Sequence, residues 1–436
     1  MKKILVYSHD AYGLGNIRRM LEITSHLVDS DPDVSVLLIS GSPMLHAFRI
    51  PPRVDYIKLP CVARSDKGES VVKSLGLSYE DTIRMRSNVI MMAMMDFNPD
   101  LILVDKKPFG IANELEPALT MARKRPNPPK VVLLLRDILD EPESTIRQWA
   151  SGKYHEAIGE TYDQVLVVGD SDIFDASDEY QFPESTTSKL RYCGYIKRPV
   201  PAKTPRQVRD RLGLGEEPLV LVTAGGGADG SRMMTSYLEG LLGRPGRGFK
   251  TLLVTGPEMS PQQGAMVAEL AARAGGVIVK EFCDDMMSHM NAADLVVSMG
   301  GYNTVCELLT LKKKTIIVPR VAPVQEQWIR AERMQARGLL RAIHPDELTP
   351  HGLLDAVVEE LSRDDVENLP LQQFEMDGLP RISAAVFTLL DQVRVASKVA
   401  RPASRKQVAG PARGFTAARS LLAGAMQRAF GSAVGA

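Results

Sequence analysis

Residues 295–310 read LVVSMGGYNTVCELLT, and this stretch decides the fold that we predict for the chain. Its first three residues form an apolar run typical of a buried strand, and a helical pattern begins after Gly300 and Gly301. Glycines between a strand and a helix let backbone N–H groups approach an anion, and the helix dipole favours negative charge there. Thr304 and Glu307 lie about one turn apart, so both can face one ligand. The stretch therefore predicts a nucleotide-sugar site, with a phosphate at the turn and a sugar hydroxyl at the carboxylate.

The composition limits the class of protein. A chain of 436 residues is too long for one ordinary core, so we expect two domains. A hydrophobic content of 44% and a charged content of 24% are ordinary for globular proteins, and a formal net charge of zero gives no argument for nucleic-acid binding. No run reaches the roughly 18 apolar residues of a membrane span. We expect a cytoplasmic protein, attached at most peripherally to the inner face of a membrane.

Short apolar runs alternate with longer helical patterns, which predicts parallel sheets with helices on both faces. In the first half, we expect strands at 4–7, 34–39, 55–59, 101–104, 131–135, 164–168 and 190–193, and helices at 17–29, 79–97, 110–125 and 144–162. In the second half, we expect strands at 219–222, 251–255, 277–280, 295–298 and 315–318, and helices at 232–242, 261–274, 284–292 and 325–337. The fold class is therefore α/β, with two Rossmann-like domains that face a central cleft.

Three closely spaced prolines mark the boundary between the two domains. Pro199, Pro201 and Pro205 lie in a stretch without periodicity, which indicates an extended linker. We predict an N-terminal acceptor-side domain at 1–198, a linker at 199–215, a C-terminal nucleotide-sugar-binding domain at 216–375, a closing helix at 376–398 and a basic tail at 399–436. The tail has apolar residues at helical spacing and no acidic residue, so it is either a disordered segment or an amphipathic contact with an anionic membrane.

A second glycine run supports a phosphate site in the C-terminal half. The sequence AGGGADG at 224–230 contains Gly225 and Gly226 and follows a predicted strand, although it matches neither a P-loop nor GxGxxG. Such a run can also be only a tight turn. Glu307 can accept two ribose hydroxyls or merely favour its helix dipole, and Gln327 either contacts the sugar or belongs to a helix start.

The first predicted βα loop supplies the candidates for acceptor binding and catalysis. It contains the acceptor-side residues Gly13, Gly15 and Arg18, and Asp137 follows a neighbouring strand at the same edge. The candidate catalytic residues are His9, Asp10, Asn16 and Asp105, and the candidates for a base among them are His9, Asp10 and Asp105. The DxD sequence at 170–172 suits loop or capping roles better than a metal, so we predict no metal site and no cofactor.

These motifs together resemble the glycosyltransferase family 28 C-terminal domain. The resemblance is carried by FCDDMMSHMNAADLVVSMGGYNTVCELL and TIIVPRVAPVQEQWIRAERMQARGLL within 282–340. It is also similar to an uncharacterised branch of predicted glycosyltransferases, through GLGNIR at 13–18, VDKKPFG at 104–110 and RDILD at 136–140. The family includes the GlcNAc transferase that completes the lipid-linked peptidoglycan precursor. The resemblance implies the two-domain GT-B architecture.

Residue by residue, the resemblance implies a donor pocket. Gly225 and Gly226 would approach the diphosphate of a nucleotide sugar, Glu307 would hold the ribose, and Gln327 would lie near the sugar. The remaining positions that the resemblance implies for the donor pocket are Gly300, Gly301, Asn303 and Thr304.

One position departs from the pattern of the relatives. They commonly have His where this chain has Asn16, and an amide accepts no proton at physiological pH. Met299 stands where the first glutamate of an E-x7-E pair would be, so inversion is expected at the sugar. The sequence thus predicts an inverting, metal-independent hexosyltransferase. Its donor would be a nucleotide diphosphate sugar, with UDP as the first candidate nucleotide and GlcNAc as the first candidate sugar. Its acceptor would be a saccharide or a lipid-linked molecule. The alternatives are a nucleotide-sugar epimerase or hydrolase and a non-catalytic nucleotide-sugar-binding protein.

Overall fold

The computed structural model describes residues 1–9, 15–64, 70–363 and 370–399. Asp10 and Gly13, which we predicted at the site, lie outside the described residues, and so does the basic tail from residue 400 onward. Residues Met1–Arg394 form one compact unit. Among the helices in the described ranges, none is long and apolar enough to cross a membrane.

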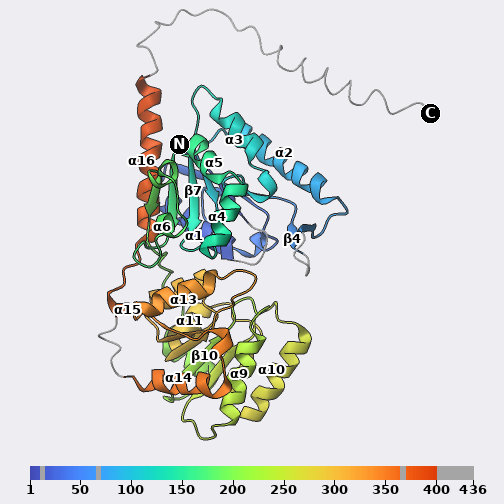
Figure 1. The fold of residues 1–436 in the computed structure, drawn as a ribbon, viewed down its shortest axis with the longest axis vertical. Helices are drawn as coiled ribbons and strands as arrows, with labels where there is room; N and C mark the ends of the chain where they lie inside the picture. The colour runs from blue at the N-terminus through green and yellow to red at the C-terminus, as the bar shows by residue number, and fades with distance from the viewer. Residues whose placement is uncertain (10–14, 65–69, 364–369, 400–436) are drawn as a thin grey trace, which may run out of the picture. The chain divides into compact units, whose positions relative to one another are not determined.

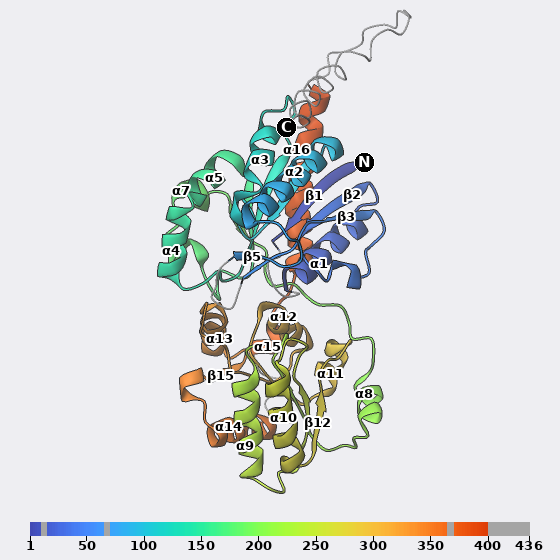
Figure 2. The ribbon, with the colours of Figure 1, turned by 90° about the vertical axis from the view of Figure 1, so that its right-hand side faces the viewer.

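The N-terminal half contains a seven-stranded sheet with the order β3-β2-β1-β6-β7-β8-β9. All its strand pairs are parallel, and Figure 2 shows β1, β2 and β3 side by side. The strands confirm the predicted positions to within two residues at either end: β1 (Lys2–Ser8), β2 (Val34–Ser40), β3 (Val54–Lys58), β6 (Leu101–Asp105), β7 (Lys130–Arg136), β8 (Gln164–Val168) and β9 (Leu190–Tyr192). An antiparallel hairpin of β4 (Val62–Arg64) and β5 (Ser70–Val72) was not predicted.

Two predicted helices of this half are each broken in two. Ala112, Asn113 and Lys153 have positive φ values of 47°, 61° and 51°, and a left-handed residue interrupts the hydrogen-bond ladder of a right-handed helix. The prediction of single helices at 110–125 and 144–162 is therefore wrong. The helical segments of this half are α1 (Gly15–Ser30), η1 (Leu45–Ala47), α2 (Tyr79–Phe97), η2 (Ile111–Asn113), α3 (Glu116–Arg123), α4 (Pro142–Ser151), α5 (Tyr154–Thr161), α6 (Ala176–Glu179) and α7 (Glu184–Thr187).

The C-terminal half repeats the pattern with a six-stranded sheet of order β12-β11-β10-β13-β14-β15. Figure 1 labels β10 of this sheet. Its pairs are again parallel. The strands are β10 (Leu219–Thr223), β11 (Lys250–Val254), β12 (Val277–Lys280), β13 (Leu295–Ser298), β14 (Thr315–Ile317) and β15 (Arg341–Ala342). The helical segments are α9 (Ser231–Leu242), α10 (Pro261–Ala274), α11 (Met286–Ala292), α12 (Tyr302–Leu311), α13 (Glu326–Ala336), η3 (Pro345–Glu347), α14 (Pro350–Ser362) and α15 (Pro370–Gln373).

The predicted linker contains a helix, α8 (Pro205–Leu212). The Thr204 hydroxyl accepts from the Gln207 amide at 3.3 Å, and the Thr204 amide donates to the Gln207 side chain at 3.0 Å. This reciprocal pair is a capping box, and Pro205 occupies the first turn, where its missing N–H costs nothing. The prediction that the whole of 199–215 is extended is therefore wrong, because Pro205–Leu212 form a helix.

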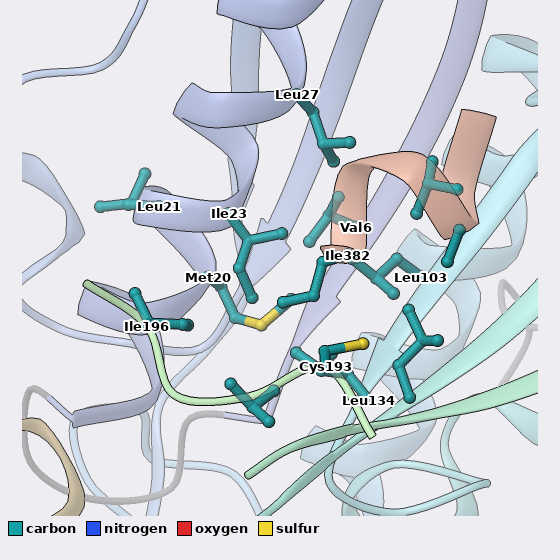
Figure 3. Packing of buried hydrophobic residues seen from close by; sticks show 14 of the residues in the cluster. Val6, Met20, Leu21, Ile23, Leu27, Leu103, Leu134, Cys193, Ile196 and Ile382 are labelled. Atoms are coloured by element: carbon teal, nitrogen blue, oxygen red, sulfur yellow. The ribbon is translucent and has the colours of Figure 1, made fainter. Parts of the chain in front are cut away.

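The closing helix α16 (Gly378–Val399) packs against the N-terminal sheet. Its residues Ile382 and Val386 are fully buried, in one hydrophobic cluster with Val6 of β1 and Leu103 of β6. Figure 3 shows Ile382 among these side chains. Burying one such side chain contributes about 1.5–3 kcal/mol, so the contact holds the end of the described chain to the first half.

Candidate functional site

Two glycine-containing turns flank the point at which the strand order of the C-terminal sheet reverses. From the centre, β10 leads outward through β11 and β12, whereas β13 leads in the other direction through β14 and β15. Ligands of open parallel sheets bind outside the carboxyl ends of strands at such a reversal. The turn after β10 contains Gly225 and Gly226, and the turn after β13 contains Gly300 and Gly301. The fold thus brings both predicted glycine turns to one edge of the sheet.

Both turns require glycine and lead into helices without a capping side chain. Gly225 and Gly300 have φ values of 68° and 72°, and a Cβ on Gly300 would lie 2.7 Å from Cγ2 of Ile317. Gly230 and Gly301 are the N-cap residues of α9 and α12, and neither helix receives a side-chain cap. The first N–H groups of these helices are therefore available to an anion, which the helix dipole favours.

Glu307 lies on α12 and is almost fully buried. Its carboxylate Oε1 accepts a hydrogen bond from Nη2 of Arg18 on α1 at 2.6 Å. The side chain of Glu307 is 3% exposed and that of Arg18 is 39% exposed, so only the arginine reaches solvent. Thr304, one turn earlier on α12, is half-buried. Glu307, which we predicted to bind the ribose, is thus paired with Arg18, which we predicted on the acceptor side.

Asn303 and Gln327 lie close to the second glycine turn. Asn303 Nδ2 donates to the carbonyl of Gly15 at 3.0 Å, and its Oδ1 accepts from Arg198. The Gln327 side chain accepts from the Arg320 amide at 3.2 Å, and its Nε2 lies 3.9 Å from the position of a Cβ on Gly301. Gln327 therefore lies in the first turn of its helix, whose N-cap is Gln325, and its side chain reaches the glycine turn.

In the N-terminal half, Asp105 is a buried structural anchor. It accepts from Nη2 of Arg19 at 2.6 Å and from the backbone N–H of His9 at 3.2 Å, and its side chain has no exposed surface. Both carboxylate oxygens of Asp105 are thus engaged by donors of the protein itself. Asp105 therefore orients Arg19 and the end of β1.

Among the candidate bases in the described ranges, His9 has a side-chain nitrogen without a hydrogen-bond partner. Its Nδ1 is buried and has no hydrogen-bond partner among the described residues. Burial, and next the positive charge of Lys106, hold the pKa of His9 well below its usual value. The imidazole is therefore neutral near pH 7, and the same burial and charges disfavour its protonated form. Asn16 helps to fix the backbone of His9, because its Nδ2 donates to the carbonyl of His9 at 2.6 Å.

Asp137, predicted on the acceptor side, belongs to a buried ion pair between the two halves. Its oxygens accept from Nε and Nη2 of Arg330 at 2.6 and 2.9 Å, and Oδ2 also accepts from Tyr195 at 3.1 Å. Arg330 also donates to Glu326 at 2.6 Å. Arg330 has no exposed side-chain surface, and its guanidinium lies 5.7 Å from the ring centroid of Tyr302.

Sequence reasoning missed Arg330 and Glu326 as part of this arrangement. Asp137 and Arg330 are 193 residues apart, so local patterns could not show the pair. The one available signal is the spacing of Glu326 and Arg330, four residues apart on a predicted helix, which is typical of an ion pair.

The DxD sequence at 170–172 and a cavity beside α2 do not belong to the site described above. The Asp170 carboxylate accepts from the Asp172 amide at 2.8 Å, which is the loop role that we preferred for the DxD sequence. Within the described ranges, no group of three or more His, Cys, Asp or Glu side chains is arranged to hold a metal ion. A cavity of about 500 Å³ lies beside α2 and η2, and none of the predicted site residues lines it.

The comparisons with known proteins agree with this geometry. Residues 219–376 match the model of the glycosyltransferase family 28 C-terminal domain. An uncharacterized glycosyltransferase of Methanopyrus kandleri is 28% identical over 186 residues, which is 42% of this chain and 50% of that protein. The UDP-N-acetylglucosamine–N-acetylmuramyl-(pentapeptide) pyrophosphoryl-undecaprenol N-acetylglucosamine transferase of Clostridium kluyveri is 28% identical over 142 residues, 32% of this chain and 38% of that protein. The chain thus spans half or less of the length of these curated relatives.

A solved structure extends the likeness of the fold to both halves. The crystal structure of Acinetobacter baumannii MurG aligns with a TM-score of 0.56 and 15% identity, over 91% of this chain and 100% of that one. The predicted GT-B fold is therefore confirmed. Residues 219–376 are therefore similar to the glycosyltransferase family 28 C-terminal domain, and the chain as a whole has the GT-B fold.

Proposed function

We propose that this protein is a glycosyltransferase that moves a hexose from a nucleotide diphosphate sugar to an acceptor bound at the N-terminal half. One observation carries the proposal. Two helices without a capping side chain begin where the strand order of the C-terminal sheet reverses, and Glu307 lies on one of them. Both helices belong to the region that matches the family 28 model. Backbone N–H groups would hold the diphosphate, and the carboxylate would accept the ribose hydroxyls. UDP-GlcNAc is the first donor to test.

The proposed reaction is a direct, inverting displacement that needs no metal. The acceptor oxygen forms a bond to C1 of the hexose while the bond from C1 to the phosphate oxygen breaks. The electron pair leaves with the nucleoside diphosphate, whose charge the helix starts stabilise. We assign the proton of the acceptor hydroxyl to His9, because its Nδ1 has no hydrogen-bond partner among the described residues.

Calorimetry with UDP tests the donor half of the proposal. Glu307→Ala removes the only carboxylate that α12 places near the turn, so UDP affinity should fall by about tenfold or more, a loss of roughly 1.4 kcal/mol or more. Glu239→Ala on α9 is the control, because Glu239 is exposed and lies about two turns along α9 from its start. Equal UDP affinity of Glu307→Ala and the unchanged protein would refute the assignment.

An assay for turnover separates transfer from the alternatives. With UDP-GlcNAc and a panel of hydroxyl acceptors, the protein should release UDP only when an acceptor is present. His9→Asn should keep UDP affinity and lose most of the turnover, since Asn cannot accept the proton. Release of free sugar without an acceptor would identify a hydrolase, formation of a second UDP-sugar an epimerase, and binding without any turnover a non-catalytic protein.

A further inference from the structure

The second glycine turn, between β13 and α12, has two backbone N–H groups with different surroundings. The Gly300 N–H donates to the buried hydroxyl oxygen of Ser298 at 3.4 Å. The Gly301 N–H has no hydrogen-bond partner among the described residues, and Gly301 is half-buried. Of the two amides, that of Gly301 is therefore the one that can bind a ligand.

The carbonyl group of the same peptide unit is held from the buried side. Nη1 of Arg330 donates to the Gly300 carbonyl oxygen at 3.2 Å, and the Arg330 side chain has no exposed surface. The Gly300–Gly301 peptide is trans, so its C=O and N–H groups point in opposite directions. Because the C=O group points to the buried guanidinium, the Gly301 N–H points away from it.

Arg330 is itself held by the N-terminal half. Its Nε and Nη2 donate to the carboxylate of Asp137, which follows β7, at 2.6 and 2.9 Å. Its Nη2 also donates to Glu326 on its own helix at 2.6 Å. A planar guanidinium with several N–H donors suits such a set of acceptors, and it fixes their directions relative to one another. The orientation of the glycine turn therefore depends on a carboxylate of the other half.

Tyr302, the first residue of α12, makes a second contact between the turn and the N-terminal half. Its ring centroid lies 5.7 Å from the guanidinium of Arg330 and 5.6 Å from that of Arg19 on α1. Its hydroxyl donates to the carbonyl of Val168, at the end of β8, at 3.0 Å. Tyr302 is 5% exposed. Buried groups thus fix the turn both at Gly300 and at Tyr302.

We propose that Arg330 is a positioning residue for the diphosphate of the donor. It acts through the Gly300 carbonyl, which it holds so that the Gly301 N–H faces the phosphate, and Asp137 of the other half orients it. This inference rests on the proposed donor site and names the residues that set its geometry. A misplaced N–H loses a hydrogen bond to a charged acceptor, which is stronger than one between neutral groups. The ribose, assigned to Glu307, does not use this amide.

Calorimetry with UDP and with uridine separates positioning of the turn from general damage. Arg330→Lys keeps a positive charge beside Asp137 and Glu326 but replaces the planar fork by an ammonium. UDP affinity should fall about tenfold, and the affinity for uridine, which has no phosphate, should stay within about twofold. Arg333→Lys on the same helix is the matched control, because Arg333 is 45% exposed and pairs with Glu179. It should change neither affinity.

Asp137→Asn tests the part of the N-terminal half. It leaves Arg330 and Glu326 as a balanced pair, so the buried arginine keeps one carboxylate. UDP affinity should fall about threefold and uridine affinity should not change, because the guanidinium is less firmly oriented. Unchanged UDP affinity of a folded Asp137→Asn protein would overturn the role of the N-terminal half.

Urea unfolding first shows which variants are folded. A folded Arg330→Lys protein that binds UDP as tightly as the unchanged protein would overturn the proposal. Equal losses for UDP and uridine would also overturn it, because the whole pocket would then be distorted. If Arg330→Lys does not fold, Asp137→Asn decides with the same two ligands. Failure of the unchanged protein to bind UDP would refute the proposed donor site itself, whereas UDP binding that neither substitution alters would refute only the positioning.

Discussion

The two halves share one sheet plan but build their binding edges by opposite means. At the C-terminal edge, glycines expose backbone N–H groups, and α12 supplies one carboxylate, Glu307. At the N-terminal edge, buried side-chain charges gather around Asp105, Asp137 and Arg330. The first edge suits a ligand of fixed shape, because backbone groups hardly move. The second depends on charge balance, so ligands and single substitutions can change its electrostatics strongly.

Breaking the buried ion pair should give the largest effect on stability. Arg330→Met removes the cation and leaves Asp137 and Glu326 buried without their partner. The free energy of unfolding, measured with urea, should fall by about 3–5 kcal/mol. Arg333→Met on the same helix is the control, since that arginine is 45% exposed and pairs only with Glu179, and its loss should cost less than about 1 kcal/mol.

Double substitution decides whether the pair itself carries this effect. Asp137→Asn should also destabilise, and adding it to Arg330→Met should cost less than the sum of the two single changes, because the second change removes a charge that the first left unpaired. Strictly additive losses would show that the two edges are not coupled through this contact.

The sequence predicted the C-terminal edge better than the N-terminal edge for a physical reason. A strand, a Gly-Gly pair and Glu307 follow one another within 295–310, so their geometry is set locally. Arg18 and Glu307 are 289 residues apart, and their contact depends on how both halves pack.

The strands were predictable from apolar runs, whereas the helix breaks at Asn113 and Lys153 were not. Both are residue types that also occur inside helices.

The stability of the N-terminal edge should also depend on pH through Lys106. Its pKa is about 7 in the folded chain and near 10.5 when unfolded. Burial lowers the folded pKa most, Arg136 and Lys107 lower it further, and Asp105 and Glu326 raise it. Between pH 7 and pH 10.5 the unfolded chain binds the extra proton, so this group makes the fold more stable as pH rises and less stable below pH 7.

Lys106→Met should remove this dependence. Without added phosphate, the variant should melt about 2–4 °C above the unchanged protein at pH 6, and the difference should shrink towards pH 10. Lys124→Met, an exposed lysine, should show no such difference at either pH. A gain in melting temperature that is the same at pH 6 and pH 10 would mean that packing, not charge, explains it.

The smallest effect should come from the ion pair that joins the two edges, Arg18–Glu307. In the described structure Arg18 donates to the carboxylate that the ribose is proposed to use, so a nucleotide must exchange one partner for another. Arg18→Met should therefore tighten the binding of uridine, measured by calorimetry, by about threefold, a modest gain because the Arg18 side of the pair reaches solvent. Uridine has a ribose and no phosphate, so it reports this exchange alone. If UDP instead binds more weakly to Arg18→Met while uridine binds more tightly, the released arginine contacts the diphosphate, and the N-terminal half then supplies a charge to the leaving group. Weaker binding of uridine itself would contradict the exchange, because Arg18 would then support the ribose rather than compete with it.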